Sequence, residues 1–151
     1  MSEYGDKAEA LFCQGYNCAQ SVICAFNNLT GLEQDTAAKL GSSFGGGLGR
    51  MREVCGAVSG AAMVLGILRG YTAPEDSQAK RDHYHLVQAL ANTFRERNGS
   101  IVCRELLDGI SVIKGRDPEA RTAEYYRKRP CPDLVREAAE ITAQLLGKTV
   151  Q

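Results

Sequence analysis

The sequence predicts an all-α fold: a single-domain bundle of about six to seven helices around a buried central helix rich in glycine and alanine. Three observations lead to this prediction. The chain has 151 residues, which suits one domain spanning 1–151. Apolar residues recur at three- and four-residue spacing along most of it. The most apolar stretch, Val54–Leu68, is shorter than the roughly 20 residues that cross a bilayer, so we expect a buried helix.

The first half of the chain is expected to hold four helices. Asn17 is a cap for the second, which is either continuous with the first or separate from it, and which ends by Gly31. The third covers about 33–44. The glycine-rich loop 44–50 then leads into the central helix. The residues expected to face the core before that loop are Tyr4, Ala8, Leu11, Gly15, Cys18, Val22, Ala25, Phe26, Leu29, Ala37, Leu40 and Phe44.

The second half continues the helical pattern. Pro74 opens a long amphipathic helix that ends at Gly99, and a short helix covers 100–107. Residues 109–116 have no decisive pattern. A polar helix is expected to start at Asp117-Pro118 and to run through Tyr126. A last helix runs from Pro132 to about 146, with Leu134, Ala138, Ile141 and Leu145 facing inward.

Composition narrows the function classes. Lys plus Arg and Asp plus Glu each total 18, so the formal net charge is zero. A neutral chain is not expected to bind nucleic acid through phosphate contacts or to attach to a membrane surface. No basic and apolar leader opens the sequence, so we expect a reducing, cytoplasmic environment and no membrane insertion.

Six cysteines are the unusual feature, and in a reducing compartment they indicate metal or redox chemistry more often than structural disulfides. The plain alternative is that they pack as small apolar side chains. No CxxC motif occurs. Four cysteines lie at predicted helix starts: Cys18, Cys55, Cys103 and Cys131. Helix N-termini offer free N–H groups and partial positive charge, which favour the thiolate.

Local residues refine this pattern. Cys131 is expected to be an N-cap, because Pro132 suits the first helical position. The small residues around Gly47 and Gly56 are expected to let backbone N–H groups approach the Cys55 sulfur, and Arg50 and Arg52 to compensate thiolate charge. Cys13 and Cys24 fall inside helices and are expected to be core residues. The segment 125–129, with its two tyrosines and three basic residues, is expected to be a surface patch.

Four segments resemble a redox-active protein family named for its C_GCAxxG_C_C pattern: Gly15-Tyr-Asn-Cys18-Ala-Gln-Ser-Val22, Cys55-Gly-Ala-Val-Ser-Gly60-Ala, Gly99-Ser-Ile-Val-Cys103-Arg-Glu-Leu106 and Cys131-Pro-Asp-Leu-Val135. The resemblance covers about 12–135. It places the family's four cysteines on Cys18, Cys55, Cys103 and Cys131. The family is also similar to a domain of split-Soret cytochromes in which an iron–sulfur centre is associated with such cysteines, although this chain has no haem-attachment motif.

The leading hypothesis is a small redox protein, an electron carrier or sensor, whose four cysteines hold one iron–sulfur cluster. Its electron partner would be another protein. A second hypothesis is a thiol–disulfide protein that uses two of the four, for example Cys18 with Cys55. Zn²⁺ in the same ligands would be redox-silent, and a scaffold bundle would need no cofactor. Whether the site lies in one chain or across a homodimer stays open.

Overall fold

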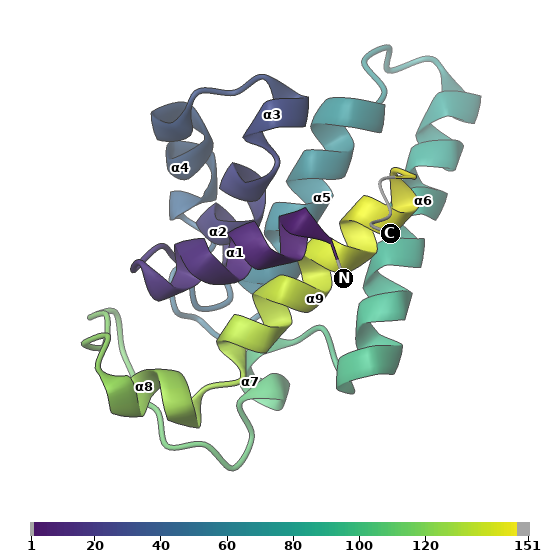
Figure 1. The fold of residues 1–151 in the computed structure, drawn as a ribbon. Coiled ribbons are helices and arrows are strands. Elements are labelled where there is room, and N and C mark those ends of the chain that lie inside the picture. Colours follow the sequence, from purple (N-terminus) through teal and green to yellow (C-terminus); the bar gives the residue numbers. More distant parts are fainter. Residues whose placement is uncertain (1, 148–151) are drawn as a thin grey trace.

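The computed structural model describes residues 2–147 and has the all-α architecture that the sequence predicts (Figure 1). Within these residues the β pairing is limited to one antiparallel bridge, between Val54 and Val102. The helices of the described part are α1 (Glu3–Cys13), α2 (Cys18–Ala25), α3 (Asn27–Thr30), α4 (Gln34–Ser42), α5 (Gly56–Arg69), α6 (Ser77–Asn98), α7 (Cys103–Leu106), α8 (Ala123–Lys128) and α9 (Cys131–Leu145).

There are more helices in the described residues than the expected six to seven, because three of them are short. The second expected helix breaks at Phe26, so that α3 is a separate turn ending at Gly31 in the left-handed conformation. The polar helix expected from Asp117 starts only at Ala123, so that prediction is wrong in its first turn. Thr122 determines the start, because its hydroxyl accepts a hydrogen bond from the Tyr125 N–H at 3.1 Å.

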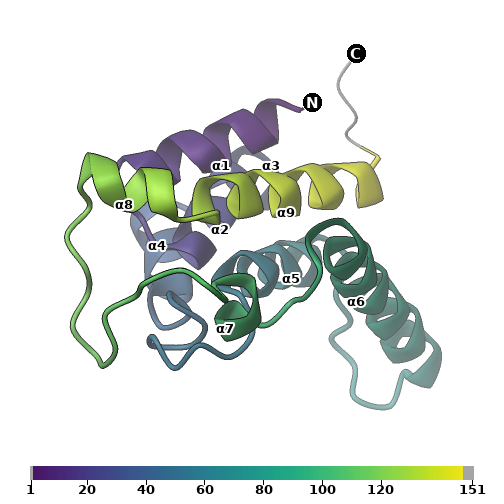
Figure 2. The same cartoon turned by 90° about the horizontal axis from the view of Figure 1, so that it is seen from below.

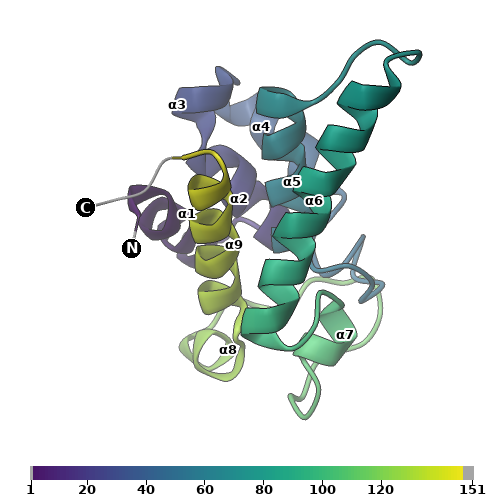
Figure 3. The same cartoon turned by 90° about the vertical axis from the view of Figure 1, so that its right-hand side faces the viewer.

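Three helices form the centre of the bundle: α2, α5 and α9 pack on one another. α1 covers α2 and α9, α4 covers α2, and α6 lies against α5 and α9 (Figures 1 and 2). Figure 3 shows α7 and α8 together at one end of the bundle, where α9 begins. The starts of α7, α8 and α9 therefore lie at the same end of the bundle.

The central helix α5 is buried as predicted, and glycine explains how closely it packs. A Cβ atom on Gly60 would lie 2.6 Å from the Ala19 carbonyl oxygen of α2. On the other side of α2, a Cβ on Gly41 of α4 would lie 2.8 Å from the Gln20 nitrogen. Small residues let helix backbones approach in this way, and here they fix the position of the first turn of α2.

Some inward-facing residues differ from the expectation. The buried face of α1 consists of Tyr4, Ala8 and Phe12, whereas Leu11 is only partly buried and Gly15 is exposed. Leu40 is 45 % exposed, because α4 covers α2 with Ala37 and Gly41. No helix within residues 2–147 combines the length and the apolar character of a membrane-crossing segment.

Candidate four-cysteine site

Four helix starts bring four cysteines to one place. Cys18, Cys103 and Cys131 are the first residues of α2, α7 and α9, and Cys55 is the N-cap of α5. All four line one cavity of about 60 Å³, which we call the cysteine cavity. That volume is several times what one water molecule needs. Its apolar wall is formed by Phe12, Leu106, Leu107, Tyr125 and Leu134.

A capping box defines the position of Cys18. The Asn17 side chain accepts from the Gln20 N–H at 2.8 Å, and the Gln20 side chain accepts from the Asn17 N–H at 3.0 Å. Asn17 also donates to the carbonyls of Gly41 and Ser42. α2 is therefore a new helix rather than a continuation of α1, and Cys18 lies in its first turn.

Cys131 lies one residue further into its helix than predicted. The N-cap of α9 is Pro130, and the Leu134 N–H donates to the Pro130 carbonyl at 3.0 Å. The prediction that Cys131 is itself the cap is therefore wrong, because Pro130 already has αR backbone, with φ −76° and ψ −3°, and its carbonyl accepts the first hydrogen bond of the helix. The cysteine still belongs to the first helical turn.

The bridge between Val54 and Val102 positions Cys55 and Cys103. The Cys55 N–H donates to the Ile101 carbonyl at 2.8 Å, and the Cys103 N–H donates to the Glu53 carbonyl at 2.6 Å. So short a pairing has no periodicity that a sequence pattern reveals. The expected helix start at Ser100 is also replaced, since α7 begins at Cys103 with Val102 as its N-cap.

The two glycines singled out in the sequence both contact cysteines. A Cβ on Gly47 would lie 2.7 Å from the Cys103 Cβ, and one on Gly56 would lie 3.1 Å from the Cys18 Cβ. Gly47 also has a φ of +71°. Three non-glycine residues of the same loop adopt positive φ, a conformation that costs roughly 1–2 kcal/mol each: Leu48, Arg50 and Arg52.

Cys131 is the acidic thiol of the four. A hydrogen bond from the Cys18 thiol, together with the charges of Arg129 and Arg121, lowers the Cys131 pKa to about 7 although burial opposes ionisation. The pKa of Cys18 is raised, because its proton is held in the bond to Cys131 and because the thiol is buried. The two sulfurs therefore form a thiol–thiolate pair near neutral pH.

The other two thiols stay protonated. Burial raises the pKa of Cys55 to about 12, although N–H groups of Ala57 and Val58 donate to its sulfur. Burial also raises the pKa of Cys103, against the opposing effect of Arg52. The expectation that helix starts favour thiolate at all four cysteines is wrong for three of them. At Cys55 and Cys103 loss of hydration outweighs the partial charge of the helix ends, and at Cys18 the hydrogen bond to Cys131 holds the proton.

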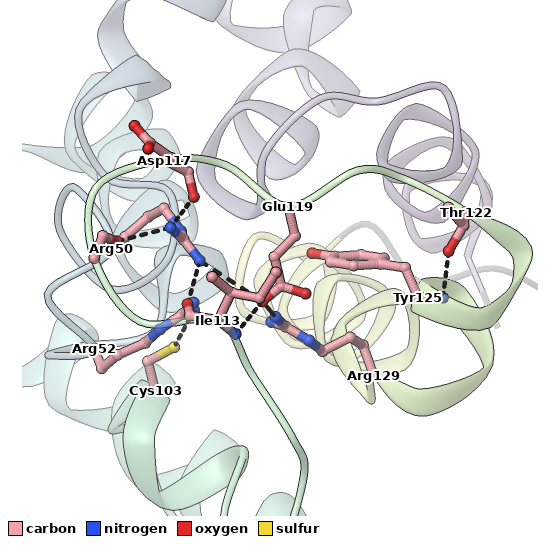
Figure 4. A network of polar contacts seen from close by, with 10 residues as sticks. Arg50, Arg52, Cys103, Ile113, Asp117, Glu119, Thr122, Tyr125 and Arg129 are labelled. Atoms are coloured by element: carbon pink, nitrogen blue, oxygen red, sulfur yellow. Dashed lines mark hydrogen bonds and ion pairs between the residues drawn. The ribbon is translucent and has the colours of Figure 1, made fainter.

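Three arginines line the cysteine cavity: Arg52, Arg121 and Arg129. Figure 4 shows Arg52 beside Cys103, with Arg50 and Arg129 in the same network of polar contacts. The Arg52 Nη1 lies 3.7 Å from the Cys103 Sγ. Arg129 has a side chain only 4 % exposed, paired with Glu119, and Arg50 pairs with the same carboxylate at 3.6 Å. The expected surface patch at 125–129 is thus wrong for Arg129, although its place two residues before Cys131 was a usable signal.

Arg121 had no signal in the sequence. Its guanidinium lies 4.2 Å from the centroid of the Phe12 ring, and it donates to the carbonyls of Phe12 and Tyr16. These contacts join the irregular segment before α8 to the end of α1. Only the folded chain brings the charge of Arg121 to the cysteine cavity.

The two remaining cysteines lie outside the cavity. Cys24 is buried in a separate small cluster with Ile23 and Ala37, which confirms the core prediction for it. Cys13 is exposed, so that prediction is wrong. It is the last residue of α1, nine positions after the buried Tyr4, and nine residues turn a helix by 900°, to the opposite face.

The donor set suits an iron–sulfur cluster or Zn²⁺ in type and number, since both take four thiolates. Across residues 2–147, however, no three His, Cys, Asp or Glu side chains already form a group that could hold a metal ion. Ligation would therefore require the four sulfurs to adjust their spacing around the cavity.

A family model described as "Putative redox-active protein (C_GCAxxG_C_C)" matches residues 16–145, which is most of the chain. The match includes all four cysteines of the cysteine cavity. Searches of curated proteins and of solved structures gave no match.

Proposed function

This chain belongs to the C_GCAxxG_C_C family, and we propose that it is a redox protein whose cysteine cavity is the reactive centre. In this proposal Cys18, Cys55, Cys103 and Cys131 hold an iron–sulfur cluster. The observation that carries the proposal is the convergence of four thiols, from four helix starts, on one cavity. When bound, such a cluster supplies reversible one-electron transfer.

The chain's own residues have definable roles in this centre. The N–H groups of Ala57 and Val58 donate to the Cys55 sulfur, and hydrogen bonds to ligand sulfur tune a reduction potential. Arg52, Arg121 and Arg129 offset the negative charge of four thiolates. The apolar wall keeps bulk water away from the sulfurs. Together these groups favour a negatively charged centre in a partly dry site.

The experiment is metal and sulfide analysis of the full chain purified without oxygen. We expect iron and acid-labile sulfide in matching amounts, and a visible absorption that bleaches on reduction. Zinc without iron would indicate a structural zinc site and overturn the redox centre. A colourless, iron-free protein, also after reconstitution with iron and sulfide, would overturn cluster binding.

A thiol–disulfide reaction is the second candidate, favoured by the hydrogen bond between Cys18 and Cys131 and by the Cys131 pKa of about 7. The Cys131 thiolate would attack a disulfide substrate and release one substrate thiolate. Cys18 would then attack the mixed disulfide, releasing the second thiolate and leaving a Cys18–Cys131 disulfide. The substrate gains two electrons. The protein, starting from the thiol–thiolate pair, loses two electrons and the one proton of Cys18, which a released thiolate takes up.

Counting thiols tests the second candidate. Oxidation of the metal-free protein by a small disulfide should remove two thiols, which a reductant restores, and peptide mapping should join Cys18 to Cys131. A mixture of pairings, or no reversible loss, would exclude this reaction.

The proposal also covers location and partners. It places the protein in a reducing compartment such as the cytoplasm, where six free thiols persist. An electron-carrying role requires a partner protein. A homodimer is not needed to complete the site, because one chain supplies all four thiols.

A further inference from the structure

A second cavity, of about 260 Å³, lies beside the cysteine cavity. We call it the arginine cavity. The two cavities share part of their lining, namely Asn17, Gly46, Arg52, Arg121, Tyr125 and Arg129. A molecule in the arginine cavity would therefore lie against the same arginines that flank the thiols.

The lining of the arginine cavity carries an excess of positive charge. Arg50, Arg52, Arg121 and Arg129 all line it, whereas Glu119 is the carboxylate among the lining residues. Figure 4 shows Glu119 between Arg50 and Arg129; it accepts a hydrogen bond from Arg129 and forms an ion pair with Arg50 at 3.6 Å. A single carboxylate thus balances one of these four buried or partly buried guanidinium charges.

Arg52 and Arg121 supply the unbalanced charge. Within residues 2–147, the Arg52 guanidinium hydrogen-bonds only to the Cys103 sulfur. The Arg121 guanidinium donates to backbone carbonyls and to the Tyr126 hydroxyl. Neither forms an ion pair there. A fifth arginine at the rim, Arg116, has a side chain 96 % exposed and pairs loosely with Asp117, so water screens most of its charge.

We propose that the arginine cavity binds a small molecule through an oxyanion group, a phosphate, sulfate or carboxylate, and holds it against the cysteine cavity. Planar guanidinium groups match the oxygens of such anions, and partial burial strengthens the attraction. The inference rests on the proposed function in one respect: if the cysteine cavity is a redox centre, the bound anion is its substrate. Binding itself requires neither a cluster nor an electron.

The competing explanation is that the arginines only balance the charge of the thiolates. It predicts no saturable site for an added anion. The cavity has about 260 Å³ of space beside the arginines, room for a small molecule, and Asn17 and Ser42 complete its lining on that side. These features favour a ligand site, and a titration separates the two explanations.

The test is calorimetric titration of the reduced, metal-free full chain with inorganic phosphate in a buffer free of other oxyanions. We expect saturable binding that weakens about tenfold in Arg52→Gln, the loss typical of one charged hydrogen bond. Arg81→Gln is the matched control. It removes the same charge from α6, where the Arg81 guanidinium donates to the Gln78 side chain and does not line the arginine cavity, and it should leave phosphate affinity unchanged.

Two further arms complete the experiment. Glycerol 3-phosphate and succinate replace phosphate; tighter binding of either assigns the oxyanion to an organic molecule, and preference for phosphate assigns it to an inorganic one. Because Arg52→Gln could misfold, phenylglyoxal modification of the wild type provides an independent measurement, in which phosphate should protect Arg52 and Arg121 but not Arg81.

Absence of saturable binding, equal weakening in both variants, or unprotected Arg52 would overturn the inference. None of these results depends on iron. A chain that binds iron and sulfide but no oxyanion would retain the proposed function and lose only this ligand site, and an iron-free chain that binds phosphate would do the reverse.

Discussion

The two ends of α2 each carry a buried or partly buried thiol, in different surroundings. Cys18 lies in the first turn, where its thiol is hydrogen-bonded to Cys131 and close to Cys55 and Cys103. Cys24 lies near the other end, in a small apolar cluster, with the Gln34 carbonyl 4.0 Å from its sulfur. The hydrogen bond to Cys131, together with burial, raises the pKa of Cys18, and burial raises the pKa of Cys24. The comparison teaches that burial does not distinguish a reactive thiol; converging helix starts and neighbouring arginines do.

The largest predicted effect is a loss of metal on mutation in the cysteine cavity, but not on mutation at the Cys24 end of α2. Cys131→Ser should lose the iron and sulfide of the anaerobically purified protein, because one of four ligands is gone. Cys24→Ser should keep the metal content of the wild type. Iron and sulfide analysis of both variants measures this. Equal metal content in the two variants would mean that the cysteine cavity is not the ligand set.

Thiol reactivity sharpens the same comparison. The Cys131 pKa of about 7 makes roughly half of this thiol ionised at pH 7, whereas Cys24, raised above its ordinary value of 9.0, is less than about 1 % thiolate. In metal-free protein, the alkylation rate of Cys131 should rise tenfold per pH unit below 7 and level off above it, while that of Cys24 keeps rising.

Mass-spectrometric rates across pH 5–10 measure both thiols in one sample. Protein unfolded in urea is the control, in which the two profiles should coincide. A Cys131 profile that levels off only near pH 9 would contradict the assigned thiol–thiolate pair.

The next largest effect is the difference in stability between an ion pair in the arginine cavity and an ion pair on the surface. Arg129→Met should lower the free energy of unfolding by about 3 kcal/mol, because Glu119 would lose its closest cation and keep the longer ion pair with Arg50 and the Ile113 N–H in a poorly hydrated place. Arg97→Met breaks an exposed pair with Glu137 and should cost less than about 1 kcal/mol. Urea unfolding of the metal-free variants compares them, and similar losses would mean that the Glu119 pair is effectively solvated.

The smallest predicted effect is on stability, and it compares two glycines of α5, Gly60 and Gly66. Gly60→Ala should destabilise the fold by about 1–3 kcal/mol, since its Cβ would meet the Ala19 backbone. Gly66→Ala, in the same helix with nothing within 4 Å of an added Cβ, should stabilise it by about 0.5–1 kcal/mol. Thermal unfolding gives both signs, and a stabilising Gly60→Ala would refute the close packing of α5 on α2.

Periodicity and capping signals were enough to predict the helical class, the central helix and the position of the four cysteines near helix starts. Asn17 is an example, because a capping box depends on residues three positions apart. The buried face of α1 was harder to predict. Leu11 and Phe12 are both apolar, and the ring of Phe12 is covered by Arg121, Tyr125 and Tyr126, which lie more than a hundred residues away in the sequence.

The charged shell of the site could not be predicted from local patterns. Arg121 reaches Phe12 across more than a hundred residues, and the bridge that aligns Cys55 with Cys103 joins segments about fifty apart. Thiol ionisation also depends on such distant neighbours. Helix starts suggested four thiolates, and three-dimensional burial allows one.

The bridge between Val54 and Val102 and the start of α9 together constrain when the centre can be assembled during synthesis. The ribosome releases the segments carrying Cys18 and Cys55 first, and the one carrying Cys131 more than seventy residues later. A nascent chain consequently exposes an incomplete set of sulfurs throughout that interval. In the proposed function, loading of the centre must wait for α9 to dock, which makes maturation a step that follows folding.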